Sequence, residues 1–164
     1  MENAYNIENV YTEKLQHSLE ILSHIDYQDK SLMFYAEKVL MHIFILGTEN
    51  CINDNANIRN ICILILENIG KLEICLSRHV GSFLRSDYET VCMMRSALKF
   101  ILENFSQIPI DWNETLDNFA YEINVKEFDE KLENYGPGYE DPNIEFDINI
   151  VKKVPKSHWW WRQI

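Results

Sequence analysis

The fold is decided by the stretch IRNICILILENIGKLEICLSRHV, residues 58–80. Apolar side chains recur in it at steps of three and four residues, which is the spacing of one face of an α-helix. Further apolar positions widen that face, so we expect this helix to lie at the centre of a bundle. The face comprises Ile58, Ile61, Cys62, Ile65, Ile69, Leu72 and Leu76, and it is widened by Ile63, Leu66 and Cys75.

Helical patterns stand on both sides of this segment. Residues 6–26 and 31–46 show the same spacing, and Gly47 is expected just past the end of the second helix. A further helix is predicted from about residue 86 to 106, and shorter ones are predicted up to Tyr121 and over 125–134. We therefore predict an all-α fold with a bundle of five or six helices over residues 1–134.

The composition changes over residues 135–164, which hold three prolines and two glycines and so exclude a long helix. We predict an extended tail packed on the bundle within one domain, with a short strand in IEFDINIV, residues 144–151. The tail ends in SHWWWRQI. In an extended segment Trp159 and Trp161 would pack on the bundle as structural residues while Trp160 faces out, or the reverse. The alternative is an exposed apolar patch for a partner.

Negative charge is concentrated in one window. The chain has a net charge of -11, and the segment from Asp111 to Asp147 contains 12 acidic residues but only two basic ones, Lys126 and Lys131. Binding of nucleic acid or of an anionic membrane needs clustered Lys and Arg, so this charge argues against both. It favours a basic protein partner, although acidic surfaces also aid solubility.

The cysteines and the N-terminus indicate a reduced compartment. Cys51, Cys62, Cys75 and Cys92 show no zinc-ligand spacing, and the last three lie among apolar residues, as buried thiols do. The sequence MENAYNIENVY has neither the basic nor the apolar region of a signal peptide. We therefore expect a cytoplasmic protein.

No catalytic or metal-binding motif is recognisable. The sequence lacks a phosphate-binding glycine loop, an HExxH motif and a nucleophile elbow, so we expect no enzyme activity, no cofactor and no metal. Residues 77–103 superficially resemble helices of HEPN ribonucleases. Members of that family carry on one helix an Arg and a His separated by four to six residues. None of Arg59, Arg78, Arg85 and Arg95 is followed by a His at this spacing.

Two charged residues interrupt apolar helical runs. Glu67 lies in ICILILENIG, and Arg95 lies in VCMMRSALKF. A buried charge needs a partner, so we predict a structural Glu67–Arg95 ion pair that fixes the register of two helices. The alternative is that both side chains point outward.

The acidic window mixes carboxylates with aromatic and aliphatic side chains, which suits the recognition of a basic protein. The terminal PKSHWWW and the small, acidic character of the chain resemble bacterial immunity proteins of contact-dependent growth inhibition and other polymorphic toxin systems. This resemblance implies that the chain binds and neutralises a cognate toxin, often a basic nuclease. The predicted partner-binding residues are Glu127, Asp129, Glu130, Glu133, Tyr139, Glu140, Asp141, Glu145, Phe146 and Asp147.

A helical adaptor or regulatory domain with another protein partner would have the same kind of acidic surface. An enzyme of an unrecognised helical family is the third possibility. Gene order distinguishes the two binding hypotheses, because an immunity gene lies directly downstream of its toxin gene. The enzyme hypothesis requires a cleft with clustered polar side chains whose pKa values are perturbed.

Overall fold

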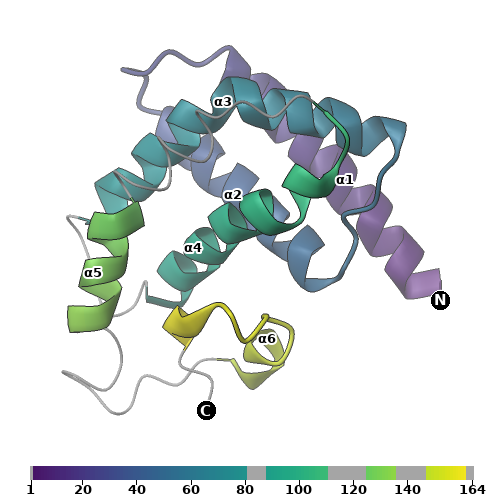
Figure 1. The fold of residues 1–164 in the computed structure, drawn as a ribbon. Helices are drawn as coiled ribbons and strands as arrows, with labels where there is room; N and C mark the ends of the chain where they lie inside the picture. Colours follow the sequence, from purple (N-terminus) through teal and green to yellow (C-terminus); the bar gives the residue numbers. More distant parts are fainter. Residues whose placement is uncertain (1, 81–87, 111–124, 136–146, 162–164) are drawn as a thin grey trace.

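The computed structural model is all-α, as predicted (Figure 1). It describes residues 2–80, 88–110, 125–135 and 147–161. The long helices are α1 (Glu2–Ser23), α2 (Leu32–Thr48), α3 (Ala56–Val80), α4 (Tyr88–Glu103) and α5 (Lys126–Tyr135). The short elements are η2 (Phe105–Gln107), α6 (Ile148–Val151) and η4 (Trp159–Trp161). The helix predicted up to Tyr121 lies outside the described residues.

Helix α3 is central, as its wide apolar face predicted. It packs against α1, α2, α4 and α5, which are the other long helices of the described chain. Ile58, Ile61, Cys62 and Ile65 are fully buried, and Leu72 is almost so. At about 1.5 Å per residue this helix is long enough to contact α1 and α2 along one part and α5 along another.

Helix α2 ends at Thr48, two residues beyond the predicted end. Gly47 was expected beyond its end, but it lies inside the helix, in contact with α4. A Cβ atom built on Gly47 would come within 2.4 Å of a Phe100 ring carbon. Glycine at this position therefore allows the Phe100 ring of α4 to pack directly against the α2 backbone, and it does not terminate the helix.

The predicted strand in the tail is wrong for residues 148–151. These residues form the short helix α6, because Asp147 accepts a hydrogen bond from the Asn149 backbone N–H at 2.9 Å and caps the turn. Partial alternation over eight residues is a weak signal, and one aspartate cap outweighs it here. Figure 1 shows α6 and the yellow C-terminal segment beside the end of the bundle.

The described helices also bear on membrane association. Among residues 2–80, 88–110, 125–135 and 147–161, no helix combines the length and the apolarity needed to cross a bilayer.

Candidate partner-binding site

Helix α5 has two chemically distinct faces. Its inner face buries Phe128 and Leu132, preceded by the buried Val125. The outer face exposes three predicted binding residues, Glu127, Glu130 and Glu133. A spacing of three residues places side chains close together along a helix, so these carboxylates form a row that we call the acidic ridge.

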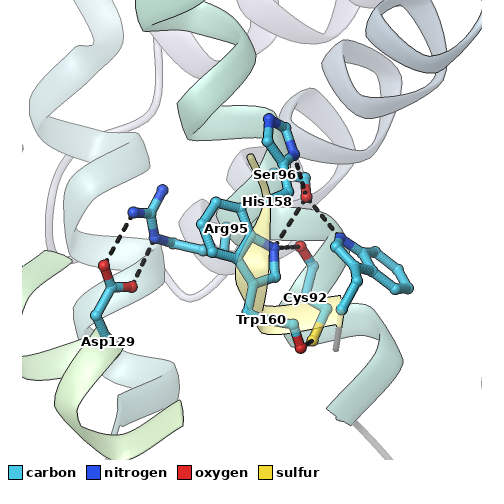
Figure 2. Close-up of polar contacts among 7 residues, drawn as sticks. Cys92, Arg95, Ser96, Asp129, His158 and Trp160 are labelled. Atoms are coloured by element: carbon cyan, nitrogen blue, oxygen red, sulfur yellow. Dashed lines mark hydrogen bonds and ion pairs between the residues drawn. The ribbon is translucent and has the colours of Figure 1, made fainter. Parts of the chain in front are cut away.

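Asp129 was predicted to bind a partner, but its carboxylate is engaged inside the molecule. It accepts hydrogen bonds from Arg95 Nε at 2.7 Å and Arg95 Nη2 at 2.9 Å (Figure 2). The Arg95 side chain is 1% exposed and that of Asp129 is 25% exposed. This bidentate pair joins α4 to α5, and it leaves the three carboxylates of the acidic ridge exposed to solvent.

The predicted Glu67–Arg95 pair is wrong. Arg95 does form a buried ion pair, but its partner is Asp129. The buried side of α3 passes through Ile65 and Asn68, which leaves Glu67 exposed to solvent. A buried arginine in an apolar run was a sound signal for an ion pair, whereas the choice of partner depended on how α5 docks.

The tryptophans at the C-terminus also differ from the prediction. Trp160 and Trp161 are both 1% exposed, whereas Trp159 is 39% exposed. The segment forms the 3-10 helix η4, in which successive side chains are about 120° apart. Two consecutive rings can therefore point inward together, which the alternation of an extended chain does not allow.

Residues 158–161, of which His158, Trp160 and Trp161 are buried, are called the C-terminal latch below. Its Trp160 ring lies beside Arg95, with the guanidinium carbon 4.2 Å from the ring centroid. Figure 2 shows the guanidinium reaching from there to Asp129. The latch, α4 and α5 are thus connected through one cation.

Ser96 is the centre of a second polar cluster. Its Oγ accepts the indole N–H of Trp160 at 3.0 Å and that of Trp161 at 2.8 Å. It also lies 3.0 Å from Nδ1 of His158, whose Nε2 is 3.3 Å from a Glu103 carboxylate oxygen. Ser96 and His158 are both 0% exposed.

The Ser96–His158–Glu103 chain resembles the relay of a nucleophilic hydrolase in its residue types. A catalytic serine must present its Oγ to a substrate carbonyl. Here the Oγ is buried and accepts two indole N–H groups. The arrangement therefore fixes the latch on α4 and does not form an open catalytic centre.

The backbone of the latch is held on α4 as well. The Trp160 carbonyl accepts hydrogen bonds from the Tyr88 hydroxyl at 3.4 Å and from the Cys92 thiol at 3.7 Å. In return, the Trp160 indole N–H also reaches the Cys92 carbonyl at 3.2 Å. Packing adds to these bonds, since the Trp161 ring stacks on Phe44 of α2.

The rest of the predicted binding surface is only partly described. Asp147 is exposed, and its backbone N–H donates to a Glu89 carboxylate oxygen at 3.0 Å. Tyr139, Glu140, Asp141, Glu145 and Phe146 lie outside the described residues. The site that can be built from the structure is therefore the acidic ridge and its internal support.

Sequence reasoning missed Ser96, Glu103 and His158 as parts of that support. The signal for Ser96 was present, because it is a lone hydroxyl inside the apolar run VCMMRSALKF and must find hydrogen bonds when buried. His158 directly precedes the tryptophans, so it enters the interior with them.

Neither known proteins nor a metal-binding cluster suggests a ligand for the described residues. The chain matches no family model, no curated protein and no solved structure. Within the described residues, no three His, Cys, Asp or Glu side chains are grouped so that they could hold a metal ion.

Proposed function

We propose that this chain is an immunity protein that binds a basic toxin domain through the acidic ridge and blocks its active site. The observation that supports the proposal most is that the acidic residues of α5 have two different environments. Glu127, Glu130 and Glu133 are exposed together, whereas Asp129 is used internally to hold the helix in place. Three carboxylates on a fixed helix present a defined pattern to a cationic surface.

The proposed mechanism is steric cover combined with electrostatic attraction. A net charge of -11 attracts a basic domain over a distance of about one Debye length, roughly 8–10 Å at physiological salt. If the toxin is a nuclease, the ridge carboxylates would occupy positions that substrate phosphates take. Such a protein would act in the cytoplasm, where an incoming toxin meets its target.

The proposal is tested by co-expressing the chain with the product of the gene next to its own. We expect a complex in a pull-down and protection of growth when the partner is toxic. The charge-reversed variant E127K/E130K/E133K should slow association by roughly tenfold or more at low salt, and its rate should depend less on salt.

A matched control separates the effect of the acidic ridge on association from the effect of the net charge of the molecule. Glu13, Asp26 and Glu67 are also exposed acidic residues, on and after α1 and on α3. The variant E13K/D26K/E67K has the same change in net charge and should bind nearly as fast as wild type. Equal effects of the two triple variants would place the interface elsewhere.

Absence of any complex and of growth protection would reject the immunity proposal. A complex that gives no protection would favour the adaptor hypothesis, in which the same ridge binds a protein that is not a toxin.

A further inference from the structure

The hydrogen bonds of Ser96 determine where the proton of His158 sits. A serine hydroxyl has one hydrogen to donate and two lone pairs that accept. Both indole nitrogens, of Trp160 and Trp161, can only donate, so they occupy the two lone pairs of Ser96 Oγ. The remaining contact, to His158 Nδ1 at 3.0 Å, must then use the serine hydrogen.

It follows that Nδ1 of His158 is an acceptor and its proton is on Nε2. That proton points to the Glu103 carboxylate oxygen, 3.3 Å away. Every polar atom of the cluster has a partner when the imidazole is neutral and in this one tautomer. We infer that the C-terminal latch is a proton-sensitive device, held on α4 while His158 is neutral and released when His158 takes up a second proton.

Protonation disrupts the cluster at Ser96. A proton on Nδ1 becomes a third donor directed at an oxygen with two lone pairs, and the serine hydrogen loses its acceptor. One indole must then leave the oxygen. Whichever indole leaves, a buried hydrogen bond to Ser96 Oγ is lost from the latch. Loss of a buried hydrogen bond is destabilising, so the change favours withdrawal of the latch.

The charged groups around His158 have opposing effects on its pKa. Glu103 favours the charged imidazole, and Arg95 and Lys99 on the same helix oppose it. Arg95 already lies over the Trp160 ring, on which the imidazole also stacks, with centroids 4.9 Å apart. Asp129 of α5 is bound to that arginine. Burial is the largest influence, and the pKa of His158 lies below its ordinary value of 6.5.

The direction of the pH effect follows from this shift. A histidine with a lowered pKa in the folded state stabilises the closed latch above its ordinary pKa. That contribution is lost as the pH falls below 6.5 toward the folded-state value. Over this interval the open fraction should grow by up to roughly tenfold per pH unit.

The test is an NMR titration of the ¹⁵N-labelled full chain from pH 7.5 to pH 5. Imidazole nitrogen shifts should identify the Nε2–H tautomer of His158 at pH 7.5. Indole N–H exchange of Trp160 and Trp161 should accelerate below pH 6.5, relative to free tryptophan at each pH. Amide exchange in the centre of α2 serves as the reference for global opening.

Two variants make the result specific. His158→Asn keeps an acceptor for Ser96 but cannot take up a proton, so its indole protection should be the same at pH 7.5 and pH 5. Glu103→Gln keeps an acceptor for Nε2–H and removes the charge that favours protonation, so release should shift to lower pH. His24 is exposed, so the control variant His24→Asn should show the same pH dependence of indole exchange as wild type.

Three results would overturn the inference. The first is an Nδ1–H tautomer at pH 7.5. The second is a His158 that becomes protonated while both indoles stay protected. The third is indole exchange that follows the α2 amides throughout, which would mean global unfolding. These measurements need no binding partner, so their failure is independent of the proposed immunity function.

Discussion

Arg95 has a buried guanidinium that contacts two separate elements. The Trp160 ring of the latch lies over it, and the Asp129 carboxylate of α5 forms two hydrogen bonds with it. Removing one member of a buried ion pair costs more than the pair contributes, because the remaining charge stays out of water. Asp129 is therefore expected to stabilise the fold, whereas the exposed carboxylates beside it are not.

The substitutions D129N and E130Q separate these two kinds of residue. Both replace a carboxylate of α5 with its amide, one in the ion pair and one on the acidic ridge. We expect D129N to lower the free energy of unfolding by about 3 kcal/mol, and E130Q to change it by less than about 0.5 kcal/mol. Urea denaturation measures both. Similar losses for the two variants would contradict the structural role of Asp129.

At the residue scale, the sequence identified the right arginine and the wrong acid. Arg95 was recognisable because a base inside VCMMRSALKF must be paired if it is buried. Glu67 was selected because it also interrupts an apolar run. The true partner comes from a short acidic helix, and which carboxylate of that helix turns inward is decided by the packing of Phe128 and Leu132.

Among the elements, α2 and α4 pack closely against each other at Gly47. Gly47 contacts the Phe100 ring, and the ring leaves no room for a side chain there. The sequence predicted both helices from their apolar spacing. It did not predict this contact, because glycine near a helix end is also the usual signal for termination.

Alanine at two helical glycines tests this close approach. We expect G47A to lower the free energy of unfolding by about 2 kcal/mol, because the methyl group would overlap Phe100. G70A is the matched control. Its Cβ would come within 2.9 Å of the Tyr27 hydroxyl, which belongs to an exposed side chain that can move.

Helix propensity favours alanine over glycine by roughly 1 kcal/mol, so G70A should be neutral or stabilising. Thermal unfolding of both variants measures the difference. A stable G47A variant would show that α2 and α4 can separate at no cost.

For the whole molecule, the C-terminal latch contributes two tryptophans to the core. Trp160 and Trp161 belong to the same buried cluster as the helices of the bundle. The sequence indicated that the tryptophans pack, since three exposed indoles would favour association. Which rings pack was not predictable, because it depends on whether the backbone there is extended or a 3-10 helix.

Ending the chain after Val154 tests the contribution of the latch. The deletion removes two buried indoles, each of which contributes roughly 3–5 kcal/mol in substitution experiments. We therefore expect a large fall in the unfolding temperature, with weakened protection of α5 in hydrogen exchange because Arg95 loses the Trp160 ring. A truncated chain with unchanged stability would instead favour the tryptophans as a binding patch.

The four cysteines allow the opening of this bundle to be followed chemically. All four are buried thiols, and burial raises the pKa of Cys62 and of Cys75 to about 12. The reactive thiolate is therefore scarce in the folded chain. Cys51 follows α2, Cys62 and Cys75 lie in the two halves of α3, and Cys92 lies under the latch. Alkylation followed by mass spectrometry would rank these four regions by how often each is exposed, and no label would have to be introduced.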